Sequence, residues 1–221
     1  MINVAIWIFY VLVALFTAFG PITARGGESA ENINRAIELQ KNSEVKKHVQ
    51  DKSFDPAKGD EDGITPLMAA AMNGNLQALK LILKLKPNLE QQNNLGDTAL
   101  AMAVSNDQDA AAKLLIESGA KVDIPVLSEN KDTLLITAAK SSEKTTQLIL
   151  KKDKKTIDQK NALGNTALIE SILAGYTDIA TMLVKNGADV SVKNNDGKNA
   201  LDLSKELKNQ TLTSLLSKKS K

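Results

Sequence analysis

Short apolar blocks alternate with polar turns along this chain, and the same order of blocks returns about every 33 residues. The clearest copy runs from Leu163 to Asn194 and predicts a turn, a short helix, a tight loop, a second helix and a second turn. In its second helix, Ile179, Met182 and Leu183 are spaced to form one apolar stripe. A unit of this size cannot bury such a stripe alone, so the pattern predicts stacked copies.

Each copy opens with a turn and a signal for the start of a helix. Glycine holds the turn position in four copies and lysine in the third, at intervals of 33, 35, 33 and 33 residues: Gly63, Gly96, Lys131, Gly164 and Gly197. A residue whose side-chain oxygen can accept a backbone N–H at a helix N-terminus follows in every copy: Thr65, Thr98, Thr133, Thr166 and Asn199. We therefore expect a hairpin tip with positive φ and then a helix at each site.

The second and third copies depart from this pattern. Gly74 and Gly175 are expected to end the first helices of their copies, whereas Asp107 and Ser142 stand at that loop position in the second and third. Two extra residues lie near residues 125–129. We expect an irregular hairpin and the weakest stacking there.

The 33-residue period, together with the Thr65-Pro66-Leu67 start, resembles the ankyrin repeat. The resemblance covers about residues 31–216. It implies an all-α solenoid of stacked helix-turn-helix units with short β-hairpin-like turns, about five repeats plus an N-terminal capping helix pair. The histidine that follows Thr-Pro-Leu in the family is replaced here by Met68, Ala101, Ile136, Ile169 and Asp202. We expect lower local stability, because a Thr–His hydrogen bond between repeats is lost.

The apolar N-terminus and the repeat pattern divide the chain into segments. We expect a signal peptide or uncleaved membrane anchor over residues 1–24 and an N-terminal linker with a capping repeat over 25–61. Four repeats follow over residues 62–94, 95–129, 130–162 and 163–195. A C-terminal capping repeat and tail occupy 196–221, because terminal repeats need a polar outer side.

The first 24 residues carry no charged side chain, and residues 4–19 are almost wholly apolar. They resemble a secretory signal peptide with cleavage after Ala24, although no basic residue precedes the apolar run. The alternative is an uncleaved anchor helix, which could also leave the domain in the cytoplasm, since Arg25 follows the apolar run. We expect an exported protein, periplasmic or secreted, with a membrane-anchored form as the alternative.

The composition argues against several kinds of chemistry. The chain has no Cys, which excludes disulfides and Cys-based zinc sites, and its net charge of +2 argues against a general nucleic-acid binder. His48 is the only histidine and has no partner at catalytic or metal-binding spacing. The acidic cluster at Asp55, Asp60, Glu61 and Asp62 does not match a calcium loop. We therefore expect no enzymatic activity, no cofactor and no metal.

A cluster of lysines surrounds Asp153, at Lys151, Lys152, Lys154 and Lys155. It falls at the end of a second helix, where lysine favours the helix dipole. We interpret it as a solvated helix end, and a basic patch for anionic lipid or an acidic partner is the alternative.

The family resemblance places a protein-binding surface on the hairpin tips and the exposed side of the first helices. Carried over by position, this predicted surface consists of Glu61, Asp62, Ile64, Met72, Asn73, Asn94, Leu95, Asp97, Ser105, Asn106, Glu129, Asn130, Asp132, Lys140, Ser141, Leu163, Asn165, Leu173, Asn195, Asp196 and Lys198. Its tips hold more carboxylates than lysines, which indicates a partner with basic or amide-rich contacts and with apolar anchors. The alternative is that Asp and Asn occur here for turn geometry alone.

The predicted function is a monomeric, non-enzymatic module that binds another protein. The alternatives are a membrane-anchored scaffold and an immunity protein that blocks a toxin or enzyme, both of which rest on resemblance. The fourth repeat is the most regular and the least charged on its predicted surface. We therefore expect it to anchor the fold, while the second and third repeats carry specificity.

Overall fold

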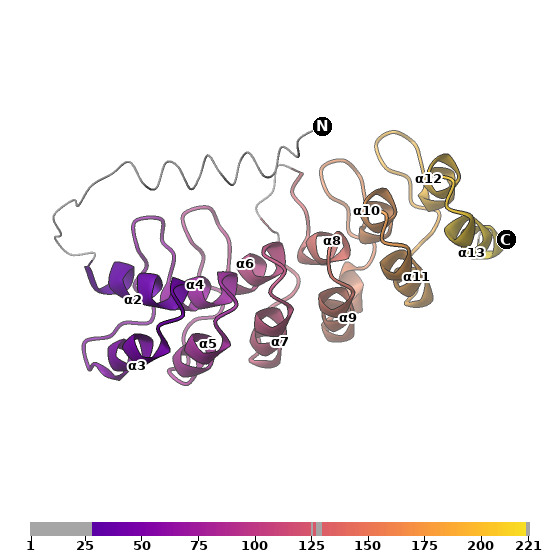
Figure 1. The fold of residues 1–221 in the computed structure, drawn as a ribbon. Coiled ribbons are helices and arrows are strands. Elements are labelled where there is room, and N and C mark those ends of the chain that lie inside the picture. Colours follow the sequence, from indigo (N-terminus) through magenta and orange to yellow (C-terminus); the bar gives the residue numbers. More distant parts are fainter. Residues whose placement is uncertain (1–27, 125, 127–129, 220–221) are drawn as a thin grey trace, which may run out of the picture.

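The computed structural model describes residues 28–124, 126 and 130–219, and these form six helix pairs stacked in chain order (Figure 1). Residues 1–24 and Glu129 lie outside the described residues. No strand occurs in the described part of the chain. The first helices of the pairs, here called inner helices, are α2 (Glu28–Glu38), α4 (Pro66–Met72), α6 (Ala99–Ser105), α8 (Leu134–Ala139), α10 (Ala167–Leu173) and α12 (Ala200–Glu206). The second, outer helices are α3 (Asn42–Gln50), α5 (Leu76–Leu83), α7 (Asp109–Glu117), α9 (Glu143–Lys152), α11 (Thr177–Lys185) and α13 (Gln210–Lys219).

The inner helices form one row and the outer helices a second row, with the hairpin loops projecting beyond the inner row (Figure 1). Each inner helix packs against its own outer helix and against the inner helix of the next pair. The predicted all-α solenoid is therefore confirmed. This stacking buries what a single unit leaves exposed.

The core runs through the whole stack and consists mainly of Leu, Ile and Ala side chains. Equivalent leucines in successive inner helices, Leu67, Leu100, Leu135 and Leu168, are each at most 2% exposed. Alanines such as Ala70 and Ala103 are fully buried. Because they add little volume, neighbouring inner helices approach closely.

The predicted caps start the inner helices. The side-chain oxygens of Thr65, Thr98, Thr133, Thr166 and Asn199 each accept a hydrogen bond from the backbone N–H three residues later. Each bond satisfies a donor that the first turn of the helix would otherwise leave free. These threonines and Asn199 therefore fix the start of every inner helix after the first.

The loop in the third repeat is shorter than the sequence pattern predicts. Gly74, Asp107 and Gly175 have positive φ in their loops, at 62°, 56° and 83°. Ser142 does not hold that position, because its hydroxyl caps α9 by accepting from the N–H of Thr145. The assignment of Ser142 to the loop glycine position is therefore wrong. The loop has lost one residue, so α9 is capped earlier than the outer helices of the other repeats.

The hairpins are closed by a side chain that the sequence analysis did not single out. Asp60, Asn93, Asn161 and Asn194 each accept backbone N–H bonds from the residues two and four positions later. Asp and Asn favour such turns because their short side chains reach their own backbone. In the third hairpin, Val126 occupies the equivalent place, and its N–H donates to the Asp132 carbonyl. That hairpin is therefore longer by two residues, as predicted, and lacks the side-chain acceptor.

We expect Lys131→Gly to raise the free energy of unfolding by about 0.5–1 kcal/mol, because Lys131 has a φ of 52° at an exposed hairpin position. Chemical denaturation of the two proteins measures this difference. Lys193→Gly is the matched control, since Lys193 is an exposed loop residue without positive φ. Equal effects of the two substitutions would show that the left-handed backbone at Lys131 carries no strain.

Candidate protein-binding face

The predicted surface residues lie mostly where the repeat pattern places them, on the hairpin tips and on the exposed side of the inner helices. We call this surface the binding face. Its exposed members are Glu61, Asp62, Asn94, Leu95, Ser105, Asn106, Leu163, Leu173, Asn195 and Asp196. Its half-buried members are Ile64, Met72, Asn73, Asp97, Asn130, Lys140, Ser141 and Lys198.

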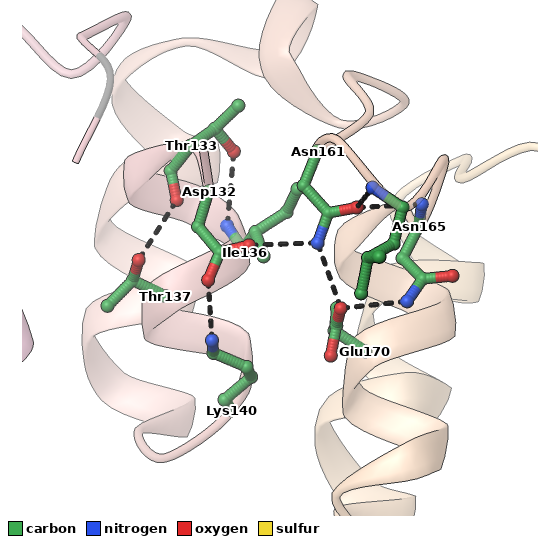
Figure 2. Close-up of polar contacts among 9 residues, drawn as sticks. Asp132, Thr133, Ile136, Thr137, Lys140, Asn161, Asn165 and Glu170 are labelled. Carbon is green, nitrogen blue, oxygen red and sulfur yellow. Dashed lines mark hydrogen bonds and ion pairs between the residues drawn. The ribbon is translucent and has the colours of Figure 1, made fainter. Parts of the chain in front are cut away.

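Two predicted surface residues are buried instead. Asp132 is 1% exposed and Asn165 is 4% exposed, so the expectation that they lie at the surface is wrong. Both lie at the junction of the third and fourth repeats, where polar side chains form a connected cluster (Figure 2). We call this the junction cluster, and its members are Asp132, Lys140, Asn161, Asn165 and Glu170.

Asp132 and Glu170 supply the two carboxylates of the junction cluster. Asp132 Oδ2 accepts from Lys140 Nζ at 2.5 Å, and Asp132 Oδ1 accepts from Asn161 Nδ2 at 2.8 Å. Glu170 Oε1 accepts from Asn161 Nδ2 and from Asn165 Nδ2, both at 2.9 Å. Donors of these kinds are needed because a buried carboxylate without a donor is costly.

Asn161 connects the two halves of the junction cluster. Its Nδ2 bridges Asp132 in the third repeat and Glu170 in the fourth, as Figure 2 shows. Its Oδ1 accepts from the backbone N–H groups of Leu163 and Asn165 and so shapes the fourth hairpin. One side chain therefore holds the tip of a repeat and attaches that repeat to its neighbour.

Glu170 is a binding-face residue that the sequence analysis missed. It lies in α10, four residues after the cap Thr166, and is half-buried. The signal was present in the sequence, because a glutamate interrupts a short helix that is otherwise almost wholly apolar. The repeat pattern alone gave no reason to distinguish this residue from a solvated one.

Three leucines give the binding face its apolar character. Leu95 is 63% exposed, Leu163 is 46% exposed and Leu173 is 44% exposed. The first two stand at hairpin positions and the third ends α10. Exposed apolar side chains that gather on one face offer a surface that a partner protein can cover.

Both lysines of the predicted surface form ion pairs in the structure. Lys140 is paired with Asp132, and Lys198 is paired with Glu206 at 2.7 Å. The hydrogen bond to Glu206 raises the pKa of Lys198 above its ordinary value. Glu61, Asp62 and Asp196 remain exposed at the tips. Lys131, which the sequence analysis did not include, is an exposed cation among them.

The described residues contain no group of three or more side chains suited to hold a metal ion. Within the same residues, no helix is both long enough and apolar enough to cross a membrane. The exposed side chains of the binding face are mainly carboxylates, amides and leucines.

Comparison with known families agrees with this geometry. A family model described as ankyrin repeats in three copies matches residues 33–126 and 123–194. This chain belongs to the ankyrin-repeat family. The hydrogen-bonded hairpins and paired helices described above are thus ankyrin repeats, and the fold is that of a protein-interaction module.

Solved structures resemble this chain over most of its length. One is a complex of a predatory endopeptidase from Bdellovibrio bacteriovorus with an immunity protein, in which the matching chain is 45% identical with a TM-score of 0.78. That match covers 85% of this chain and 97% of the other. The ankyrin repeat protein EF0377 is 26% identical with a TM-score of 0.74, covering 87% of this chain and 98% of its own.

Curated relatives are more distant. The probable 26S proteasome regulatory subunit p28 of Saccharomyces cerevisiae is 33% identical over 147 residues, which are 65% of this chain and 64% of that protein. The ankyrin repeat and KH domain-containing protein mask-1 of Caenorhabditis elegans is 33% identical over 132 residues, 59% of this chain. The match spans only 5% of the length of mask-1, so the similarity is confined to a short run of repeats within that protein.

Proposed function

We propose that this ankyrin-repeat protein is an immunity-type inhibitor, which binds an endopeptidase through its binding face and has no enzymatic activity of its own. The observation that carries the proposal is the 45% identity to a chain of the endopeptidase–immunity protein complex, over 97% of that chain. A relative that matches from end to end supports a shared role better than one that shares only some repeats. We take the matching chain to be the immunity protein, because the ankyrin fold offers no catalytic set.

The geometry of the binding face supports this role. An inhibitor gains affinity from a surface already ordered before contact, because little conformational entropy is then lost on binding. The hairpins here are fixed by backbone N–H groups that donate to the side chains of Asp60, Asn93, Asn161 and Asn194. Leu95 and Leu163 stand on these hairpins. The exposed tip carboxylates Glu61, Asp62 and Asp196 favour a partner whose contacting surface is basic or rich in amides.

We also propose that residues 1–24 export the protein to the periplasm or the cell exterior. The apolar run and the small residue Ala24 at the expected cleavage site support export. An inhibitor must also share a compartment with its peptidase. A membrane-anchored scaffold is the second candidate, favoured by the same apolar run. Sequencing the N-terminus of the protein from its own cells separates the two, since export with cleavage predicts a start near Arg25 and the anchor predicts Met1.

The inhibitor role is tested with the Bdellovibrio endopeptidase as the probe. The chain from residue 25 onward, which contains every described helix, is titrated into the endopeptidase while binding and peptidase activity are measured. We expect the two proteins to form a complex and the peptidase activity to be lost near an equimolar ratio of the two. Binding with full activity would indicate an accessory role instead, and absence of binding would contradict the proposal.

A further inference from the structure

Glu170 differs from the residues at the same place in the other repeats. Four residues after their caps, the other inner helices carry Ala69, Met102, Thr137 and Leu203, and none of these is charged. Glu170 is therefore the one carboxylate that these described helices place at this position. It lies on the binding face and is only half-buried, so a partner can reach it.

Hydrogen bonds to one of its two oxygens hold the Glu170 carboxylate in a fixed orientation. Its Oε1 accepts both amide bonds of the junction cluster, at 2.9 Å each. Among the described residues, Oε2 takes no hydrogen bond or ion pair, and Figure 2 shows it pointing away from both asparagines. Glu170 thus presents a fixed anionic oxygen with capacity for further donors.

The junction cluster contains more negative than positive charge. Asp132 and Glu170 supply two carboxylates, whereas Lys140 is its one cation and bonds to Asp132. A carboxylate in poorly hydrated surroundings is stabilised most by an opposite charge at hydrogen-bond distance. The leucine at the end of the same helix, Leu173, is 44% exposed and can cover the apolar stem of a long basic side chain.

We propose that Glu170 binds a lysine or arginine side chain of the endopeptidase and thereby determines which peptidase this chain accepts. This inference rests on the proposed inhibitor function and names a contact within it. The ammonium or guanidinium group donates to Glu170 Oε2, and its stem packs on Leu173. The junction cluster holds Glu170 in place for that contact.

The first test compares Glu170→Gln with the wild type, using the Bdellovibrio endopeptidase as the probe. Glutamine keeps an acceptor for both asparagines and removes the charge, so we expect the stack to fold and Kd to rise about tenfold or more. The change in Kd with ionic strength should also become smaller. Glu143→Gln, at an exposed position on outer helix α9, is the matched control and should change Kd less than about twofold.

A second variant leaves the junction cluster intact. Thr137 lies at the equivalent position in α8, which packs against α10, and its side chain bonds only to its own helix. Thr137→Arg should bring a cation from the same chain to Glu170 and weaken binding, whereas Thr137→Gln, of similar length and uncharged, should weaken it far less.

The outcomes separate the two proposals. Failure of the wild type to bind the endopeptidase contradicts the inhibitor function itself. Binding by the wild type that Glu170→Gln leaves unchanged contradicts the role of Glu170 alone. Equal losses for Thr137→Arg and Thr137→Gln would indicate steric obstruction and also contradict the cation contact.

Discussion

Asn161→Ala is expected to lower the free energy of unfolding by about 3 kcal/mol, the largest effect of any single polar substitution that we predict. The substitution removes the donor that Asp132 and Glu170 share and the acceptor for two backbone N–H groups. Asp132 is almost fully buried, so water cannot replace the lost donor without disturbing the packing of the hairpin. Chemical denaturation followed by circular dichroism measures the loss.

Asn194→Ala is the matched control for this prediction. Asn194 holds the equivalent place in the last hairpin, where its Oδ1 also accepts two backbone N–H groups. Asn194 bridges no buried carboxylates, so we expect Asn194→Ala to lower the free energy of unfolding by only about 1 kcal/mol. The difference between the two variants isolates the contribution of the bridge between the third and fourth repeats. Equal losses would mean that the junction cluster adds nothing to stability beyond shaping the hairpin.

Features that depend on residues close together in the chain could be predicted from the sequence. A threonine cap acts on an N–H three residues away, and a glycine tip depends on its own φ, so Thr98, Gly96 and their equivalents identified the repeats. The apolar stripes could be predicted for the same reason, since helical spacing places their residues on one face. The all-α solenoid followed from these local signals and the 33-residue period.

The burial of Asp132 and Asn165 could not be predicted in this way. Asp132 is buried because Asn161, which is 29 residues away, reaches it from the next repeat. At an exposed tip, the same aspartate would be an ordinary turn residue, and its sequence surroundings do not distinguish the two cases. Ser142 was misplaced for a related reason. The residue missing from its loop is made up later in the same repeat, so Gly164 still follows Lys131 at the regular interval and the spacing hides the loss.

Reversal of the exposed tip charges is expected to slow association with the endopeptidase about tenfold or more at low salt. The triple variant replaces Glu61, Asp62 and Asp196 by lysine, since these carboxylates are exposed and lie at both ends of the binding face. Asp132 is excluded, because a lysine there would be buried beside Lys140 and the variant would report on folding instead. Stopped-flow measurement of the association rate provides the readout.

The matched control reverses Glu117, Glu143 and Asp178, three exposed acids of the outer helices, and adds the same six units of positive charge. If attraction depends on the net charge of the protein, both triple variants slow association equally. If the binding face itself guides the partner, only the tip variant does so, and the difference shrinks in high salt as the charges are screened. The dissociation rate should change little in the tip variant, because rim charges mainly affect encounter, whereas Glu170→Gln should act mainly on dissociation. The two kinds of carboxylate on this face therefore have separable kinetic roles, one in approach and one in retention.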